Sequence, residues 1–320
     1  MIRRGVLAAV LAAALLLGWF VSGWYMSGPL AKDTPFIVPD GSTLASVAAK
    51  LEQNGAISSA SAFKLRARVF GVGASIKAGE FMLPKGASPS RILSIIQGDE
   101  VLRRFVTVPE GMPSIMVYDR LMANSQLTGS IDVPAEGSIL PDTYEIERGE
   151  SRQAVLLRMQ AAMQRALGEL WAGRDQNLVV KTPEEALTLA SIVEKETGKP
   201  SERGIVAGLY SNRLRQGIML QADPTIIYPI TKGKPLGRRI RQSEIQAVND
   251  YNTYSMIGLP KGPITNPGKA SIAAVLHPAQ TDALYMVADG TGGHQFASTL
   301  EQHNVNVEKW YTIRKERGDF

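Results

Sequence analysis

The stretch Thr182–Gly198, TPEEALTLASIVEKETG, carries the signals of one helix with a defined start and a defined end. Thr182 suits the N-cap and Pro183 the first helical position, and Glu185 completes a Thr-x-x-Glu capping box. Gly198 stands where a glycine typically ends a helix. The stretch therefore predicts a helix of about four turns, around which the rest of the chain can be arranged.

One carboxyl of this helix falls among its apolar side chains. At about 100° per residue, Leu189, Ile192 and Val193 gather in one narrow sector. Glu196 falls in the same sector, whereas Glu194 points elsewhere. A carboxyl that faces a core near the negative end of the helix dipole should have a raised pKa, which suits a general acid at a glycosidic bond. The alternative is a carboxyl that turns to solvent or pairs with a neighbouring lysine.

The composition excludes several classes of site. The chain has 320 residues, 44% of them apolar and 20% charged, which is enough for two domains beside an anchor. The net charge of +5 suits an anionic lipid or polymer, but it is also common without such a partner. There is no cysteine, so disulfides, zinc–thiolate sites, iron–sulfur clusters and thiol nucleophiles are excluded.

Residues 1–31 are predicted to form a cytoplasmic tip and a single transmembrane anchor. Gly5 to Met26 is strongly apolar, and as a helix it spans about 33 Å, enough for a bilayer core of about 30 Å. Arg3 and Arg4 precede it, so the positive-inside rule keeps the N-terminus in the cytoplasm. This predicts a single-pass protein of the inner (cytoplasmic) membrane whose remaining domains lie in the periplasm. A cleaved signal peptide is the alternative.

Residues 34–100 are predicted to form a small α/β module. A short strand over 36–38, a Pro-Asp-Gly turn and a helix with apolar residues at i, i+3, i+4 and i+7 from Leu44 come first. A second helix, a strand over 79–83 and a helix begun by Ser88-Pro89 follow. The order resembles a LysM domain, a module that binds cell-wall glycan, and FIVPDGSTLASVA matches best. A purely structural module would have the same pattern.

Residues 101–320 are predicted to form a mixed α+β domain that includes the Glu196 helix, so the fold class is α+β. Periodicity predicts a strand over 103–108 and helices over 114–124, 155–170 and 201–217. The stretch 231–269, rich in glycine, proline and basic residues, is expected to be a long surface loop with one short helix near Ser243. A hairpin around DGTGG and a closing helix capped by Ser298 complete the domain.

Polar side chains crowd the loops between these elements, where binding groups commonly lie. Tyrosines beside amides suit the apolar faces and hydroxyl groups of sugars. The candidate substrate-binding residues are Asn212, Gln221, Asp223, Thr225, Tyr251, Asn252, Tyr254, Asn266, His294 and Asn304. Each of them could instead be structural, because side chains such as Asp223 and Asn266, which precede prolines, also cap and start turns.

Other chemistries lack their motifs. The three histidines, at positions 277, 294 and 303, do not have metal-ligand spacing, so no metal ion is expected. No GxSxG elbow, Walker motif or dinucleotide-binding glycine motif is present, and neither a cofactor nor a nucleic-acid partner is expected. A carboxyl acid/base remains, and glycan is the natural substrate of an exported enzyme of this kind.

Six motifs occur in the order and spacing of one known family. They are ASIVEKET, NRL, LQADPTIIY, YNTY, GLPKGPITNPG and TGGHQFASTLEQHN. They resemble the MltG/YceG-like family of endolytic murein transglycosylases, most strongly from Ser191 to Asn304. The resemblance implies that Glu196, the second glutamate of EKE, is catalytic. Lys261 stands where the family usually has the second proline of GLPPGPI, which puts the rigidity of that loop in doubt.

The resemblance implies cleavage of the MurNAc-GlcNAc β-1,4 bond in nascent peptidoglycan strands, which leaves 1,6-anhydro-MurNAc ends and limits strand elongation. Glu196 would donate a proton to the departing oxygen and then accept one from the MurNAc 6-hydroxyl. The implied enzyme is a carbon–oxygen lyase, with glycan strands and penicillin-binding synthases as partners. A hydrolase would need a second carboxyl, for which Asp223 and Glu194 are candidates. The alternative is a non-catalytic, membrane-tethered peptidoglycan-binding scaffold in which Glu196 is structural.

Overall fold

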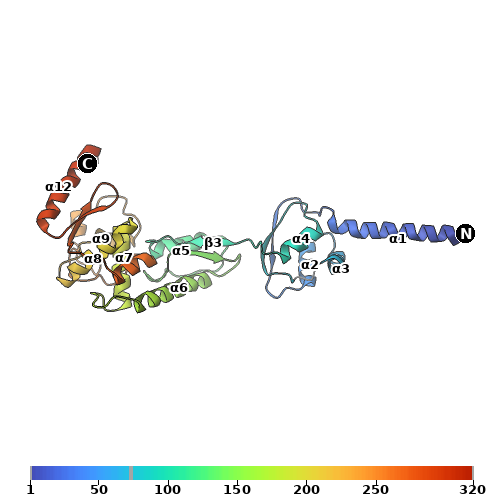
Figure 1. Cartoon of the computed structure of the whole chain (residues 1–320), viewed down its shortest axis with the longest axis horizontal. Helices are drawn as coiled ribbons and strands as arrows, with labels where there is room; N and C mark the ends of the chain where they lie inside the picture. Colours follow the sequence, from blue (N-terminus) through green and yellow to red (C-terminus); the bar gives the residue numbers. More distant parts are fainter. Residues whose placement is uncertain (1, 72–74, 319–320) are drawn as a thin grey trace. The chain divides into compact units, whose positions relative to one another are not determined.

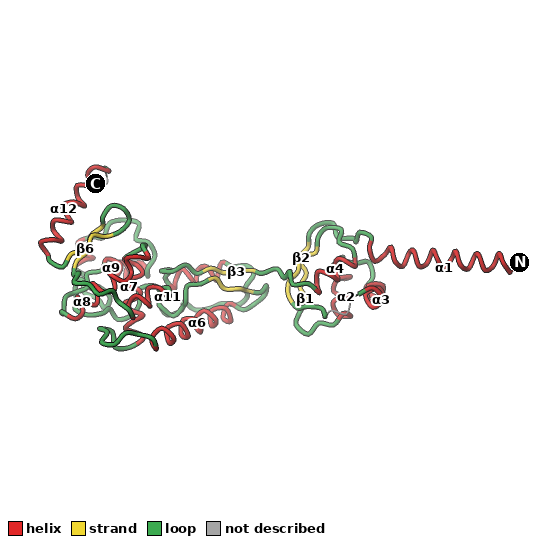
Figure 2. The backbone as a smooth tube through the Cα atoms, in the orientation of Figure 1, coloured by secondary structure: helices red, strands yellow, loops and turns green. Residues whose placement is uncertain are grey.

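The structure is a computed structural model that describes residues 2–71 and 75–318. The chain divides into two compact units, Met1–Arg104 and Phe105–Phe320, and Figure 1 labels most of their helices. The strands are short and pair two by two, while helices and loops make up most of the chain (Figure 2). The predicted α+β fold class is therefore confirmed.

The first unit is built on one antiparallel pair of strands with helices packed against it. Its elements are α1 (Ile2–Tyr25), β1 (Thr34–Val38), α2 (Leu44–Gln53), α3 (Ala60–Phe70), β2 (Gly79–Leu83) and α4 (Pro89–Gln97). Phe36 of β1 lies opposite Phe81 of β2, and both rings are buried in the core of the unit. From β1 onward the elements follow the predicted order, whereas the resemblance to a LysM domain stays a prediction.

The helix α1 covers the apolar segment for which the sequence predicts a transmembrane anchor. That prediction is not confirmed, since no helix within residues 2–71 and 75–318 has both the length and the apolar character that crossing a membrane requires. The last turns of α1 pack against the first unit. Trp24 is 2% exposed and its ring lies 5.7 Å from that of Phe63. The Arg66 guanidinium donates to the Phe20 carbonyl at 3.0 Å, so this end of the segment is occupied by protein contacts.

The second unit holds the motifs of the predicted active site. Its elements are β3 (Arg104–Thr107), α5 (Ser114–Ala123), β4 (Thr143–Ile146), α6 (Arg152–Ala172), α7 (Pro183–Glu196), η1 (Pro200–Glu202), α8 (Arg203–Arg215), α9 (Asp223–Thr231), α10 (Gln242–Ile245), α11 (Lys269–Leu276), β5 (Tyr285–Ala288), β6 (His294–Ala297) and α12 (Leu300–Arg317). β3 pairs with β4, and β5 and β6 form an antiparallel hairpin. The helices, the first strand and the hairpin predicted for residues 101–320 all correspond to elements in this unit.

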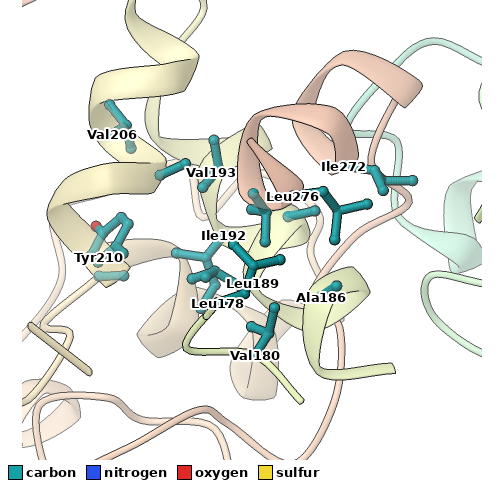
Figure 3. Packing of buried hydrophobic residues seen from close by; sticks show 14 of the residues in the cluster. Leu178, Val180, Ala186, Leu189, Ile192, Val193, Val206, Tyr210, Ile272 and Leu276 are labelled. Carbon is teal, nitrogen blue, oxygen red and sulfur yellow. The ribbon is translucent and has the colours of Figure 1, made fainter. Parts of the chain in front are cut away.

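The helix α7 lies in the main core of the second unit. Its Leu189, Ile192 and Val193 are fully buried, and they pack with side chains from α8 and α11 (Figure 3). The predicted apolar sector is therefore confirmed. At the start of the helix, the Thr182 hydroxyl accepts from the backbone N–H of Glu185 at 3.2 Å. The Glu185 carboxylate bonds one residue earlier than a capping box requires, because it accepts from the N–H of the residue before the N-cap.

The end of α7 agrees with the prediction. The last helical residue is Glu196, Thr197 is the C-cap with an extended backbone (φ −133°, ψ 129°), and Gly198 follows directly. The N–H of Thr197 still closes the last turn by donating to the carbonyl of Val193. Glu196 therefore holds the last helical position, at the point where the chain leaves the core.

The stretch 231–269 is not a surface loop throughout. It contains the predicted short helix as α10, and its other residues form turns and loops. However, Asn252, Thr253, Thr265 and Asn266 are fully buried. Polar side chains can be buried where they satisfy the hydrogen-bonding groups of irregular backbone. Composition predicts the lack of regular structure, but it does not reveal this burial, which depends on partners elsewhere in the chain.

Candidate active site

A cavity of about 320 Å³ opens at the end of α7, and its volume is in the range of small-ligand sites. Segments that are far apart in the sequence line it, including α7, α8, the turn before α9, the β5–β6 hairpin and α12. The lining residues are Glu196, Leu209, Tyr210, Arg213, Leu220, Gln221, Asp223, Tyr254, Met286, Val287, Ala288, His294 and His303. The structure thus brings together five of the predicted site residues: Glu196, Gln221, Asp223, Tyr254 and His294.

Glu196 lines this cavity from the last turn of α7. Its Oε1 atom is buried and has no hydrogen-bond partner in the described part of the chain. The pKa of Glu196 is raised to about 7, mainly by burial and further by the negative charge of Asp223, while a hydrogen bond with Tyr210 opposes the rise. The C-terminal end of the helix dipole acts in the same direction as burial. A carboxyl with this pKa can donate a proton near neutral pH.

Two residues of α8, Tyr210 and Arg213, line the cavity but are not among the predicted site residues. They stand three positions apart and so share one face of the helix. Burial raises the pKa of Tyr210 well above its usual value, so its hydroxyl stays neutral beside Glu196. Arg213 is 7% exposed, and it donates to the carbonyl of Leu284 at 2.6 Å and to Oε1 of Gln221 at 3.2 Å. Nothing in the NRL spacing distinguishes such a buried cation from a solvated one.

Asp223 places a second carboxylate in the cavity. Its Oδ1 accepts a hydrogen bond of 2.7 Å from the Tyr254 hydroxyl. The sequence predicts a loop here, but Asp223 is the first residue of α9, with Pro224 following in its first turn. A negative charge is stabilised at a helix N-terminus, and proline is compatible with the first turn. Gln221 turns the chain toward α9 with a φ of 52°.

The YNTY motif holds this turn in place. The carbonyl of Thr253 accepts from the N–H of Gln221 at 3.1 Å, and its hydroxyl accepts from the N–H of Ala222 at 3.0 Å. The hydroxyl of Thr225 lies 2.8 Å from that of Thr253, and both side chains are fully buried. Thr225 therefore stabilises the turn before α9 through Thr253, and it does not line the cavity.

His294 reaches the cavity from the first residue of β6. Its Nδ1 lies 2.8 Å from Oε2 of Glu202, and its backbone N–H donates to Oε1 at 3.1 Å. Burial would raise the pKa of Glu202, but the hydrogen bonds with His294 outweigh burial and hold that pKa below its usual value. A Cβ at Gly293 would stand 2.2 Å from Oε1 of Glu202. The second glycine of the TGGH motif thus lets the hairpin approach η1 without a shift of the Glu202 and Lys199 side chains.

His303 of α12 also lines the cavity. In the sequence it is considered only as a metal ligand, so it is not among the predicted binding residues. Its ring stacks on that of Tyr285 with 5.2 Å between centroids, and its buried Nδ1 has no partner among the described residues. Burial lowers the pKa of His303, and the positive charge of Arg213 lowers it further, so the ring is neutral near pH 7. A neutral imidazole can exchange a hydrogen bond with a sugar hydroxyl. The adjacent Asn304 is exposed and is not a lining residue.

Two of the predicted binding asparagines donate hydrogen bonds from their side-chain amides to backbone carbonyls. Asn212 donates to the carbonyls of Thr281 and Ala283 at 2.8 and 3.2 Å. Asn252 donates to the carbonyl of Ile245 at 2.9 Å and is fully buried. Neither asparagine lines the cavity. Both asparagines therefore have a structural role, which is the alternative to ligand binding that the sequence leaves open.

Asn266 links three segments of the second unit. Its Nδ2 donates to the carbonyl of Met112 at 2.9 Å and to the hydroxyl of Ser114 at 3.1 Å. Its Oδ1 accepts from the backbone N–H of Ile139 at 3.0 Å. Because it is fully buried and outside the cavity lining, Asn266 holds the GLPKGPITNPG segment and does not face a ligand.

The motif helix α7 holds the same segment through two further side chains. The Ser191 hydroxyl accepts from the N–H of Ile264 at 3.0 Å, and Oε2 of Glu194 accepts from the N–H of Gly268 at 2.9 Å. The other carboxylate oxygen of Glu194 lies 3.8 Å from the Arg203 guanidinium. Glu194 is therefore occupied by the protein and is not among the residues that line the cavity.

Tyr251 and Lys261 belong to the YNTY and GLPKGPITNPG segments and do not line the cavity. The ring of Tyr251 packs 4.8 Å from that of Tyr228, and it is not a lining residue. The backbone N–H of Lys261 donates to the carbonyl of Asp250 at 2.9 Å, and its Nζ lies 3.1 Å from Oδ2 of the same residue. A proline at 261 would lack this N–H. Hydrogen bonding therefore fixes the loop at the position where the family usually has a rigid proline.

The cavity combines the Glu196 carboxyl, which is partly protonated near neutral pH, with the side chains of Asp223 and Arg213. Glu196 can protonate a leaving oxygen, and a carboxylate at Asp223 can stabilise positive charge that develops on a substrate nearby. In the described residues 2–71 and 75–318, no three His, Asp or Glu side chains gather where they could hold a metal ion.

The sequence is similar to known proteins along most of its length. The YceG-like family matches residues 36–309. An endolytic murein transglycosylase of Bacillus subtilis (strain 168) is 26% identical over 325 residues, covering 90% of this chain and 89% of that protein. An endolytic murein transglycosylase of Streptococcus pneumoniae serotype 2 is 28% identical, covering 84% of this chain. The chain spans 57% of the length of that pneumococcal protein.

A solved structure has a related fold. A crystal structure of a yceG-like protein from Listeria monocytogenes matches with a TM-score of 0.54, covering 86% of this chain and 98% of that chain. Because the two sequences are 24% identical, this likeness bears on the fold alone.

Proposed function

The chain belongs to the YceG-like family, and from that premise we propose that it is an endolytic murein transglycosylase. Its relatives from B. subtilis and S. pneumoniae carry that name. The observation that carries the proposal for this chain is the cavity that Glu196, partly protonated near neutral pH, lines together with the carboxyl group of Asp223.

The proposed reaction cleaves the β-1,4 bond between MurNAc and GlcNAc within a glycan strand. Glu196 donates its proton to the glycosidic oxygen as the bond from that oxygen to the anomeric carbon breaks. The resulting carboxylate accepts the proton of the MurNAc 6-hydroxyl while the hydroxyl oxygen bonds to the anomeric carbon. The strand then ends in 1,6-anhydro-MurNAc and Glu196 is protonated again. One carboxyl therefore serves as acid and base.

Asp223 has two roles in this scheme. Its negative charge helps to keep Glu196 protonated before the reaction. The same charge stabilises the positive charge that develops at the anomeric carbon in an oxocarbenium-like transition state. The hydrogen bond from Tyr254 fixes the Asp223 carboxylate for both roles.

Hydrolysis is a second candidate, and the position of Asp223 is the observation that favours it. A glycoside hydrolase needs a second carboxyl as base or nucleophile, and Asp223 lines the same cavity as Glu196. Glu194 no longer competes for this role, because its carboxylate is bonded to Gly268 and lies outside the lining.

The location and partners follow from the proposed substrate. We propose that the second unit works outside the cytoplasmic membrane, where peptidoglycan strands are extended. Penicillin-binding synthases are the proposed partners, because they extend the strands whose length this cleavage would limit.

Product analysis tests the proposal. The full-length protein is incubated with purified peptidoglycan that contains uncross-linked strands, and the new ends are identified by mass spectrometry. We expect 1,6-anhydro ends, which are one water lighter than hydrolysed ends. New reducing ends would favour the hydrolase instead. Binding without any new ends would support a non-catalytic peptidoglycan-binding scaffold.

A further inference from the structure

A second cavity, of about 470 Å³, lies in the same unit. Its walls are mainly apolar, with residues from the loop after β3, from α5, from α9 and from the loop that follows α9. They include Pro109, Met112, Pro113, Met116, Ile227 and Leu236. The volume is sufficient for a small ligand or part of a larger one.

This second cavity borders the proposed active site. Lys195 lines the second cavity and the next residue, Glu196, lines the first. In the same way Asp223 lines the first cavity and the next residue, Pro224, lines the second. The ends of α7 and α9 that carry these pairs belong to helices that pack against each other (Figure 1). Because consecutive Cα atoms are about 3.8 Å apart, the two cavities lie close enough together for one extended substrate to reach both.

The walls of the second cavity are fixed by close packing. The loop after α9 approaches Pro113 so closely that a Cβ at Gly233 would stand 2.7 Å from Cβ of Pro113. On the other side, the N–H of Gly111 donates to the carbonyl of Asn266 at 3.0 Å. The cavity is thus held open by structure that exists without a ligand.

Three charged residues line the second cavity, Glu110, Lys195 and Lys234, and two of them are in ion pairs. The Glu110 carboxylate lies 3.1 Å from the Arg203 guanidinium, and Nζ of Lys234 lies 2.8 Å from a carboxylate oxygen of Asp119. Lys195 is exposed and has no ion pair or hydrogen bond with any residue that the structure describes. The cavity therefore offers apolar surface and one unmatched positive charge, which suits an acidic ligand with small apolar side chains.

We propose that the second cavity binds the peptide stem carried by the MurNAc residue whose bond is cut. This inference rests on the proposed function. The stem is joined through a lactyl ether to the same sugar ring that must contact Glu196. It contains small apolar residues such as alanine, which match the apolar walls, and it carries free carboxylates, which match Lys195. A continuing glycan chain would instead need polar partners for its hydroxyl groups, and the apolar walls offer few.

The substrate preference of the full-length protein tests the inference. Two substrates are compared: glycan strands with their peptide stems, and the same strands after an amidase has removed the stems. The measured quantity is the ratio of kcat/KM on stem-bearing strands to kcat/KM on stem-free strands. We expect wild type to prefer stem-bearing strands. Lys195→Glu should reduce the ratio about fivefold to tenfold, because an attraction becomes a repulsion at an exposed site. Leu236→Trp, which fills the cavity, should reduce it as well.

Lys309→Glu is the matched control. Lys309 is an exposed lysine of α12 outside both linings, and its replacement changes the net charge by the same amount. It should leave the ratio unchanged. A wild-type ratio near one, or an unchanged ratio in both cavity variants, would overturn the inference while cleavage itself still supports the proposed function. If Leu236→Trp slows cleavage of both substrates equally, the cavity binds sugar and the inference is also wrong.

A binding measurement separates the two proposals if no strand is cut. Binding of a soluble muramyl tripeptide and of N-acetylmuramic acid is compared by calorimetry. Tighter binding of the tripeptide that Lys195→Glu removes would support the stem site even if the proposed enzymatic function failed. Equal binding of the two compounds would contradict the stem site.

Discussion

At the scale of single residues, the environment of Glu196 separates it from the other acidic residues of the second unit. Glu196 and Glu194 are two positions apart on α7, and both side chains are removed from solvent, since the Glu194 side chain is 6% exposed and Oε1 of Glu196 is buried. The structure gives Glu194 a backbone N–H and an arginine as partners, and it leaves Oε1 of Glu196 buried without a partner in the described residues. The same residue type thus supports the fold at one position and is available for chemistry at the other.

The pH dependence of cleavage follows from the Glu196 carboxyl. Its pKa is raised to about 7, and the first step requires the protonated form. We therefore expect kcat/KM to fall as the pH rises through about 7, by tenfold per unit above it. Asp223→Asn removes a negative charge that raises this pKa, so the fall should move to lower pH. Initial rates on one soluble glycan from pH 5 to 9 measure both effects, and a fall that stays in place in Asp223→Asn would exclude this coupling.

The sequence predicts part of the site at this scale. Glu196 can be selected from helical periodicity, because one local rule determines which face of α7 it occupies. Tyr210, Arg213 and His303 cannot be selected in this way, since their roles depend on segments that meet only in the folded unit. Loop asparagines are equally ambiguous. Asn212, Asn252 and Asn266 have the composition expected of ligand contacts, but their amides satisfy backbone groups.

At the scale of elements, α7 both carries Glu196 and holds the loops of the family motifs. Ser191 and Glu194 bind the GLPKGPITNPG segment, while Thr253 of YNTY binds the turn that presents Asp223. These motif residues therefore form hydrogen bonds with other motif segments. Their spacing reflects the loop geometry that the cavity needs as much as direct contact with a substrate.

Asn266→Ala tests this structural role. The substitution leaves the buried N–H of Ile139 without its partner, and the carbonyl of Met112 keeps only the longer bond from the backbone N–H of residue 266, at 3.4 Å. An unsatisfied buried group costs about 1 to 3 kcal/mol, which corresponds to a fall in Tm of roughly 2 to 10 °C for a unit of this size. Asn304→Ala removes an exposed amide and serves as the control. Thermal unfolding followed by circular dichroism measures both, and equal Tm values would contradict the role of Asn266 as a link between segments.

The elements themselves are largely predictable, because helices and strands follow from local periodicity. The exceptions have tertiary causes. The helix α9 begins at Asp223 in a stretch expected to be loop. The burial within 231–269 arises from hydrogen bonds to distant segments such as the one that contains Met112. This burial has no signal within a few residues of the sequence, whereas Asp223 and Pro224 are themselves compatible with a helix start.

At the scale of the whole molecule, the proposed location of the second unit can be tested directly. The substrate lies outside the cytoplasmic membrane, so a reporter joined to the C-terminus should reach that side. We expect alkaline phosphatase, which is active only after export, to be active in the fusion, and green fluorescent protein fused at the same place to remain dark. The opposite pattern would show that the second unit stays in the cytoplasm and would exclude the proposed encounter with peptidoglycan.

The central claim is that Glu196 supplies the proton for glycan cleavage, and one comparison tests it most directly. The rate of release of new ends from purified peptidoglycan is measured for full-length wild type, Glu196→Gln and Glu194→Gln, after circular dichroism has shown that all three are folded. Glutamine keeps the size of the side chain but cannot transfer a proton. We expect Glu196→Gln to lower the rate by about 10² to 10⁴ and Glu194→Gln to lower it far less. A folded Glu196→Gln protein that cuts at the wild-type rate would contradict the claim.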